Sequence, residues 1–280
     1  MGKKYEFTVD DEQKATAFLA TAVAGLSRAK ADILVKSGEV RVNGSRIKSN
    51  TALRRGDIVT VFVPDGVSRD VSLKTVYDDD NIVVFDKPKR TAYDALPELY
   101  GSPLFAVHRL DTNTTGLIAF AKTEYALAEL TAAFRERRVS KLYEAVVSPA
   151  PVAERAVLTA YMKLLRSQNT VIVSAEPKAG YKTMITEYEV KERIGGAAVL
   201  RVFPHTGRTH QIRAHLNFVG CPIIGEHKYY IRGGAIAGAP DTQMLAAVEL
   251  SFSGLKGKLA YLNGKVFRAP SAFELDFLRG

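Results

Sequence analysis

The sequence predicts an α+β protein, in which a large domain on a mostly antiparallel mixed sheet follows a small module of two helices and a hairpin. Two observations predict this fold class. Segments with strand-like patterns outnumber those with long helical periodicity, and few strands alternate strictly with helices, as a doubly wound parallel sheet would require. With 280 residues, 46% of them hydrophobic and 25% charged, the chain can bury a substantial core.

Two helices are expected near the N-terminal end. Apolar residues recur at helical spacing over residues 11 to 23. A second helix is predicted over residues 27 to 38, with Ile33 and Leu34 on its buried face. Gly38 would end this helix in a left-handed conformation, which glycine adopts without a steric penalty.

A β-hairpin follows the helices. Val40 and Val42 alternate with charged residues, as in a strand that is buried on one side. The next pair, Asn43-Gly44, suits a tight hairpin turn, and residues 58 to 63 have the pattern of a further strand. The N-terminal part is therefore predicted to be a helix-helix-hairpin unit.

This unit carries an excess of positive charge. Between residues 28 and 55 there are eight basic and two acidic residues. Such an excess favours contact with phosphates, because each neutralised phosphate releases counterions. A solvated basic face on a small module would have the same composition. The candidate phosphate contacts are Arg28, Lys30, Lys36, Arg41 and Arg46.

Residues 65 to 70 combine Gly, Ser and charged residues without apolar periodicity, so we predict a linker there. This divides the chain into a small unit over residues 1 to 64 and a main domain over residues 71 to 280. In the main domain we expect one long helix, several strands and one strand pair. The helix covers 124–138, the strands cover 82–85, 117–121, 143–147 and 198–203, and the pair uses 171–173 and 186–190.

Charge and cysteine content narrow the partners and the compartment. The formal net charge of +9 favours a polyanionic partner. Cys221 is the one cysteine, which excludes an intramolecular disulfide and a cysteine-based zinc cluster and fits a reducing cytoplasm. The first residues lack the apolar run of a signal peptide, and no uncharged apolar stretch reaches about 18 residues. We therefore expect a cytoplasmic protein without membrane contact.

The most informative segment is HRLDTNTTGLIAFAKT, residues 108 to 123. Charged and hydroxyl residues are concentrated directly before an apolar strand, which is typical of a loop that presents groups into a cleft. Asp111 could serve as a nucleophile or base, and Arg109 could hold phosphate or replace an extruded base. The same side chains could instead cap a turn and form a surface ion pair.

Residues 204 to 229 form a second dense segment, with four of the chain's five histidines. The apolar spacing predicts a helix over residues 209 to 218, whose start near Gly207 would offer backbone donors to an anion. His210 and His215 lie five residues apart, which places them about 140° apart around a helix. They do not share a face and no ligand set is completed around them, so we predict no metal site.

The order of residues adds a resemblance to known families. The string GLSRAKADILVKSGEVRVNGSRI resembles the S4 RNA-binding domain, over about residues 14 to 64. The main domain resembles the RluA-type RNA pseudouridine synthases, because residues 108 to 122 match the family signature of HRLD, two residues, TSGL and AK. Other segments match in the family's order, namely DKPKR at 86–90, KLYEA at 141–145, TEYEV at 186–190 and GRTHQIRAHLNFVGCPIIGEHKY at 207–229.

The resemblance implies an isomerase that converts chosen uridines to pseudouridine in structured RNA without a cofactor. Asp111 matches the essential aspartate, Tyr143 the aromatic residue that packs on the flipped base, and Arg213 the basic residue that pairs with the aspartate. The main domain is therefore expected to have the fold of the family's catalytic domain. Contacts with RNA are implied for His108, Arg109, Arg208, His210 and Gln211 in the main domain, and for the basic residues of the S4 unit.

The expected substrate is 23S ribosomal RNA, by resemblance to relatives that carry an S4 unit, with transfer RNA second and a monomer as the expected state. This chain departs from the family pattern at several positions. Lys89-Arg90 replace a small residue and Gly, Glu226 replaces an aspartate, and Ala246 stands where a histidine is common.

Two alternatives remain at this point. The missing histidine supports a non-catalytic RNA-binding factor with a degenerate main domain, and the histidine-rich segment allows a metal-dependent nuclease.

Overall fold

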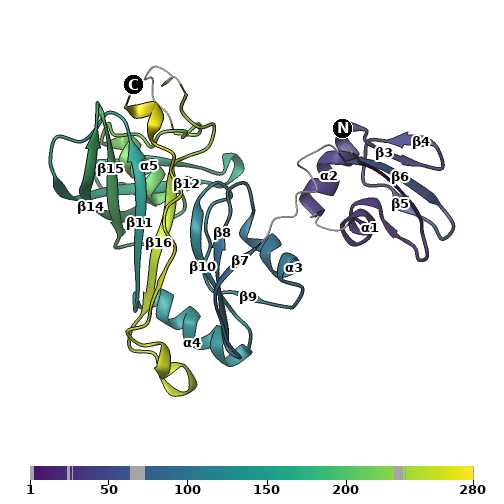
Figure 1. Cartoon of the computed structure of the whole chain (residues 1–280), viewed down its shortest axis with the longest axis horizontal. Helices are drawn as coiled ribbons and strands as arrows, with labels where there is room; N and C mark the ends of the chain where they lie inside the picture. The colour runs from purple at the N-terminus through teal and green to yellow at the C-terminus, as the bar shows by residue number, and fades with distance from the viewer. Residues whose placement is uncertain are drawn as a thin grey trace. The chain divides into compact units, whose positions relative to one another are not determined.

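The computed structural model describes residues 3–23, 26, 28–63, 73–229, 236 and 238–279. The chain divides into two compact units, Met1–Ser72 and Leu73–Gly280 (Figure 1). The linker predicted at residues 65 to 70 lies outside the described residues, so its bounds stay a prediction. None of the described helices combines the length and the apolar character needed to cross a membrane.

In the N-terminal unit, two helices pack on a four-stranded antiparallel sheet of order β1-β6-β3-β4. Their shared core contains Leu19 and Val35 from the helices and Val59 from the sheet, and all three are fully buried. A short pair, β2 and β5, completes the unit. The elements are β1 Lys3–Thr8, β2 Gln13–Lys14, α1 Ala15–Ala22, α2 Arg28–Ser37, β3 Val40–Val42, β4 Ser45–Ile47, β5 Ala52–Leu53 and β6 Ile58–Val63.

Local features of this unit follow from its residues, with one correction. Gly38 ends α2 with a φ of +76°, and the hairpin turn has φ of +49° at Asn43 and +79° at Gly44, as predicted. The prediction for Ile33 is wrong, because its side chain is 64% exposed whereas that of Leu34 is 3% exposed. Neighbouring residues lie about 100° apart on a helix, so a narrow buried face takes one of them.

The C-terminal unit is built on one large sheet of order β13-β12-β14-β15-β11-β16-β10-β8-β7, with β17 beside β16 and β9 beside β10. In the described part of this sheet, β10 and β16 are parallel and the other pairs are antiparallel, which confirms the predicted α+β class. The strands are β7 Lys74–Asp78, β8 Ile82–Lys87, β9 Phe105–Ala106, β10 Thr115–Ala121, β11 Val139–Val147, β12 Arg155–Leu165, β13 Thr170–Ser174, β14 Lys182–Ile194, β15 Ala197–Pro204, β16 Leu245–Phe252 and β17 Val266–Arg268.

Short helices join these strands. α4 contacts β9 and β10, and α5 contacts β13, β14 and β15. The predicted helix at 124–138 ends earlier than expected, and the one at 209–218 begins later. The helices are η1 Tyr93–Ala95, α3 Leu96–Tyr100, α4 Glu124–Arg135, η2 Arg166–Gln168, α5 Gln211–Phe218, η3 Gly257–Leu262 and η4 Asp276–Leu278.

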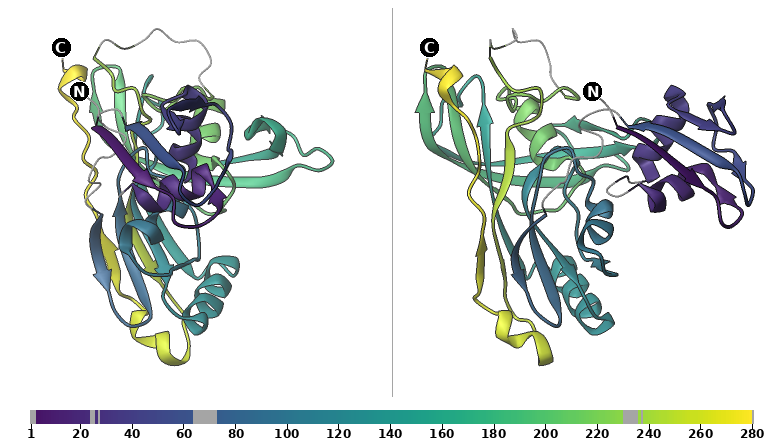
Figure 2. Two further views of the ribbon diagram at one scale, coloured as in Figure 1. Left: turned by 90° about the vertical axis from the view of Figure 1, so that its right-hand side faces the viewer. Right: turned by 45° about the vertical axis from the view of Figure 1, so that its right-hand side comes forward.

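The predicted pair of strands at 171–173 and 186–190 is wrong in its pairing. β13 and β14 both form, but each pairs with β12 rather than with the other. The sequence did not predict β12 because its outward face carries apolar residues such as Val157, which is 61% exposed, and these blur the alternation. The hairpin of β12 and β13 projects from this edge of the sheet (Figure 2).

The close approach of β10 to β16 depends on Gly116. This residue has a φ of +95°, and a Cβ built on it would lie 2.1 Å from the carbonyl oxygen of Ala247. Glycine is therefore required on both conformational and steric grounds. The parallel pairing places the start of β10, and the loop of residues 107–114 before it, beside the first residues of β16.

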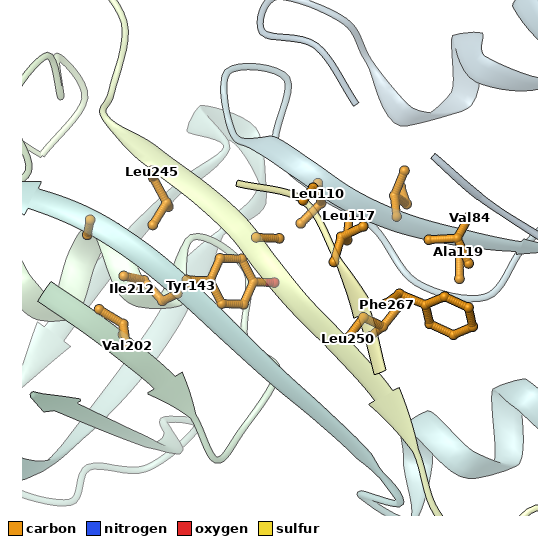
Figure 3. Packing of buried hydrophobic residues seen from close by; sticks show 14 of the residues in the cluster. Val84, Leu110, Leu117, Ala119, Tyr143, Val202, Ile212, Leu245, Leu250 and Phe267 are labelled. Atoms are coloured by element: carbon orange, nitrogen blue, oxygen red, sulfur yellow. The ribbon is translucent and has the colours of Figure 1, made fainter. Parts of the chain in front are cut away.

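The core lies on the face of the sheet where β10, β11 and β16 meet. Figure 3 shows Tyr143 of β11 among Leu245 of β16, Ile212 of α5 and Val202 of β15, which belong to one buried cluster. Apolar side chains therefore pack against the ring of Tyr143. The same packing positions the polar residues that are described next.

Candidate active site

A cleft of about 350 Å³ opens between the loop of residues 107–114, β11 and the segment 204–213. Its volume is in the range of small-molecule sites. The site residues predicted for the main domain all line it, namely His108, Arg109, Asp111, Tyr143, Arg208, His210, Gln211 and Arg213. The predicted contacts Arg28, Lys30, Lys36, Arg41 and Arg46 belong to the other unit.

Loop 107–114 is held from below by a buried lysine. The ammonium of Lys87, which has no exposed surface, donates to the carbonyl oxygens of Pro88 (3.1 Å), Thr91 (3.0 Å) and Thr112 (3.0 Å). Burial lowers the pKa of Lys87 to about 7, and the charge of Asp111 acts in the opposite direction. The bond to Thr112 fixes the backbone next to Asp111, and the other two tie it through Lys87 to the segment of residues 88–91.

Asp111 forms an ion pair with Arg213, and Arg213 is in turn held by Glu226. Asp111 Oδ2 lies 2.7 Å from Arg213 Nη1, while Arg213 Nε and Nη2 donate to the two oxygens of Glu226 at 2.6 and 3.0 Å. Burial favours the neutral form of Arg213, but its bonds and charge contacts with Glu226 and Asp111 outweigh this and raise its pKa. Arg213 is therefore a permanent cation beside Asp111.

Tyr143 contributes a neutral phenol. Its side chain is 9% exposed, and it pairs through β11 with Val202 and Ala247. Burial, followed by the nearby charge of Asp111, raises the pKa of Tyr143 well above its usual value. The group is protonated at neutral pH and presents an aromatic surface to the cleft.

His210 lies on the other side of Asp111. Its Nδ1 is 2.5 Å from the hydroxyl oxygen of Tyr229, and its Nε2 is 3.9 Å from Asp111 Oδ1. The backbone has a φ of +53° at the start of α5. Burial is the largest effect on its pKa, which is lowered. His210 is thus a mostly neutral ring that faces the carboxylate.

Two residues with predicted RNA contacts form bonds within the protein. The Nε2 atom of His108 accepts from the backbone N–H of Ala119 at 2.9 Å, and its ring stacks on Phe134 with centroids 4.5 Å apart. Burial, and then the charge of Lys141, lower the pKa of His108 to about 3. This neutral histidine ties the loop to β10.

Both polar atoms of the Gln211 side chain form hydrogen bonds within the protein. Its oxygen accepts from the hydroxyl of Thr206 (2.7 Å) and the N–H of Arg208 (3.0 Å). Its nitrogen donates to the carbonyl of Ile185 (2.8 Å) and the hydroxyl of Thr186 (3.1 Å). The RNA contact predicted for Gln211 therefore finds no free polar atom, and this residue shapes the turn before α5.

Two arginines retain groups that can reach a ligand. Arg109 is exposed, with its guanidinium carbon 5.6 Å from the ring centroid of Tyr93. Arg208 is half-buried and donates through Nε to the carbonyl oxygen of Thr183 at 3.1 Å. Within the described residues, no three His, Cys, Asp or Glu side chains gather as a metal ion would need.

The geometry agrees with comparisons to known proteins. The model of the RNA pseudouridylate synthase family matches residues 71–218, and that of the S4 domain matches residues 17–59. The chain belongs to the RNA pseudouridylate synthase family. The predicted family and the S4 unit are thereby confirmed, and the members are isomerases.

Several relatives are similar over most of this synthase. The ribosomal large subunit pseudouridine synthase C of Vibrio cholerae is 32% identical over 245 residues, which cover 78% of this chain and 76% of that protein. An uncharacterised RNA pseudouridine synthase of Synechocystis is 32% identical over 262 residues, with 84% and 79% covered. The solved structure of human RNA pseudouridylate synthase domain containing 1 shares the fold, with a TM-score of 0.59 and 22% identity over 75% of this chain and 94% of that one.

Two departures of this synthase from the family pattern, Ala246 and Glu226, leave the cleft intact. Ala246 pairs with Glu144 and packs with Leu142 and Val248 in a small cluster, apart from the cluster that contains Tyr143. Alternation along a strand places it on the opposite face from Leu245, which lines the cleft. The missing histidine is therefore no argument for a degenerate site. Glu226 keeps a carboxylate on Arg213.

Sequence reasoning missed some residues that hold the synthase site together. Tyr229 connects His210 to the backbone N–H of Val171, which donates to its hydroxyl at 3.1 Å. Lys87 ends the strand Ile82–Lys87, whose first four residues are apolar, and a lysine at the end of such a run is a signal for a buried charge. Tyr229 carried no comparable signal in the sequence.

Buried histidines predict a pH dependence of stability for the synthase. His215 is 1% exposed, and burial lowers its pKa to about 4, so the unfolded chain binds the proton more tightly. The free energy of unfolding should therefore fall as the pH drops from about 6.5 to 4, by up to about 1.4 kcal/mol per pH unit for this residue. Urea unfolding across this range should show a shallower pH dependence for His215→Asn. The matched control is His227→Asn at an exposed site, and equal slopes in all three proteins would contradict the assignment.

Proposed function

We propose that this protein isomerises specific uridines of large-subunit ribosomal RNA to pseudouridine, with Asp111 as the catalytic carboxylate. The observation that carries the proposal is the position of Asp111 in the cleft, 2.7 Å from the cation of Arg213 and near the buried phenol of Tyr143. The substrate is suggested by relatives that are named for the large ribosomal subunit. Transfer RNA is the second candidate.

The reaction needs the uridine out of its stack. Extrusion costs a few kcal/mol in stacking and pairing, and aromatic or guanidinium groups can recover part of it. Arg109, which is exposed at the rim, suits the space left in the RNA, and Tyr143 suits a contact with the flipped base. These roles follow the chemistry of the two side chains.

The chemical step exchanges one bond to the sugar for another. The bond from C1′ to N1 breaks and a bond from C1′ to C5 forms, while C5 loses a proton and N1 gains one. Atoms and electrons balance without a redox partner. Asp111 can attack the nucleotide or accept a proton during this exchange, and Arg213 supplies a fixed positive charge beside it.

The N-terminal unit is proposed to add RNA affinity through phosphate contacts. Arg41 and Arg46 lie opposite each other on β3 and β4, and both are exposed. The guanidinium carbon of Arg41 is 5.9 Å from the ring centroid of Phe62. Arg28 is also exposed, and Lys36 pairs with Asp32 at 2.5 Å. Such groups position an RNA without reading its sequence.

Asp111→Asn should abolish turnover and leave RNA binding intact. The amide keeps the shape of the side chain but can neither attack nor accept a proton, so release of tritium from C5-labelled ribosomal RNA should fall at least about a thousandfold. The dissociation constant for the RNA should stay within a few-fold of the wild type. Asp80→Asn, at an exposed position, is the matched control and should be fully active. Parallel loss of binding and turnover would argue against a chemical role.

The charges of the N-terminal unit should set the salt dependence of binding. Replacement of Arg41 and Arg46 by Gln should reduce the slope of log affinity against log salt by about 0.7 to 0.9 for each phosphate that is no longer neutralised. The control is Lys3→Gln with Lys4→Gln, on β1 at the opposite edge of the same sheet. Filter binding to 23S RNA over a range of KCl concentrations measures both. Identical slopes for the two double variants would show that β3 and β4 do not contact RNA.

A further inference from the structure

One end of the cleft carries positive charge that the proposed chemistry does not use. Besides Arg213 and Arg109, which already have proposed roles, the cleft is lined by Arg137, Lys141 and Arg208. Among the described residues that line it, Asp111 is the acidic one, and its carboxylate is paired with Arg213. The remaining cations therefore face a space without a protein counter-charge.

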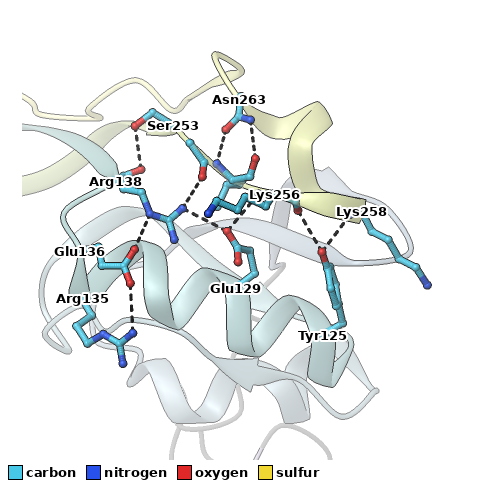
Figure 4. A network of polar contacts seen from close by, with 11 residues as sticks. Tyr125, Glu129, Arg135, Glu136, Arg138, Ser253, Lys256, Lys258 and Asn263 are labelled. Carbon is cyan, nitrogen blue, oxygen red and sulfur yellow. Dashed lines mark hydrogen bonds and ion pairs between the residues drawn. The ribbon is translucent and has the colours of Figure 1, made fainter.

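Arg137 is placed in the cleft by the end of α4. Its φ is +60°, a left-handed conformation that usually falls to glycine after a helix. Its neighbour Arg138 takes up the nearby acceptors, with bonds to Glu136 (2.9 Å), Glu129 (3.2 Å) and the carbonyl of Gly254 (2.9 Å), as Figure 4 shows. In the described part of the chain, no carboxylate lies within ion-pair distance of Arg137.

Lys141 brings a second charge deeper into the same space. It is half-buried, and burial lowers its pKa. The described residues place no carboxylate within 4.0 Å of its ammonium, although an unpaired cation in such a position is costly. The opposite wall is Gly207, where an added Cβ would lie 4.0 Å from Lys141 Nζ. The missing side chain leaves room in front of the ammonium.

The strand fixes where this charge lies relative to the base pocket. Val139, Lys141 and Tyr143 alternate along β11, and all three line the cleft. Residues two apart in a strand are separated by roughly 7 Å. A group bound at Lys141 therefore lies one residue repeat from the phenol that faces the base, a spacing that suits the ribose between a base and its phosphate.

We propose that Arg137 and Lys141 form a phosphate-binding subsite for the backbone of the target nucleotide. This inference rests on the proposed function, since it assigns the backbone of the same substrate. Lys141 supplies a compact charge and Arg137 a planar fork of donors, which are the two usual ways of holding a phosphate. The subsite has a mechanical purpose. The uracil must leave C1′ and turn, and a fixed phosphate keeps the sugar at Asp111 meanwhile.

The test compares a charged with a neutral linkage. The substrates are short RNAs with the uridine that the wild type modifies, tritiated at C5, and with either a phosphate or a methylphosphonate on its 5′ or 3′ side. The wild type should lose about tenfold in kcat/KM on one of the neutral linkages, as expected for one charge-assisted contact. Lys141→Gln and Arg137→Gln should lose about as much on the phosphate substrate and little more on the neutral one.

Controls separate the possible failures. Arg135→Gln removes the same charge two residues before Arg137, where the side chain is exposed and pairs with Glu136, and it should behave as the wild type. Lys141→Arg should retain the preference for phosphate, which guards against a variant that merely folds poorly. If Lys141→Gln and Arg137→Gln lower kcat/KM by the same factor on the phosphate and on the methylphosphonate substrate, the two side chains do not hold that phosphate. That result overturns the inference. If the wild type releases no tritium from any uridine in the RNA, the proposed function itself fails.

Discussion

The structure of the site depends on Arg213, which bridges the carboxylates of Asp111 and Glu226. Its guanidinium holds Glu226 with two bonds and leaves one Nη1 for Asp111 at 2.7 Å. The side chain of Glu226 has no exposed surface and that of Arg213 is 11% exposed, so the pair is shielded from competing water. Such a planar fork fixes direction as well as charge. The bond from Arg213 therefore fixes the position of the Asp111 carboxylate, although Asp111 lies on a loop.

The surrounding elements serve to bring this bridge to one place. Gly116 lets β10 lie against β16, and Lys87 fastens the loop of residues 107–114 from beneath. His108 ties the same loop to β10, while Gln211 shapes the turn that starts α5 with Arg213 on it. Each of these hydrogen bonds is at least partly buried. These contacts fix the loop that carries Asp111, the proposed catalytic carboxylate.

The sequence predicted the residues that line the cleft better than the strand pairing that positions them. Residue types and spacing pointed to loop 107–114 and to the start of α5, but left open that Asp111 caps a turn. The catalytic role proposed for Asp111 was implied by the resemblance to a family. The parallel contact of β10 with β16 joins segments about 130 residues apart, which no local pattern reveals. The unpredicted β1 is an edge strand in which Tyr5 and Phe7 are the two apolar positions that alternate with exposed residues, so its pattern is short. The prediction that Ile33 is buried was wrong because helical spacing alone does not choose between adjacent apolar residues.

The central claim is that Glu226 acts through Arg213 to position Asp111, and its most direct test is kcat for tritium release by Glu226→Gln beside Glu226→Asp. Glu226 is buried and does not line the cleft, so it can affect the reaction through Arg213. The account predicts that the amide lowers kcat about tenfold or more while RNA affinity is kept, and that the shorter carboxylate retains most activity. A Glu226→Gln protein that folds and turns over at the wild-type rate would contradict it.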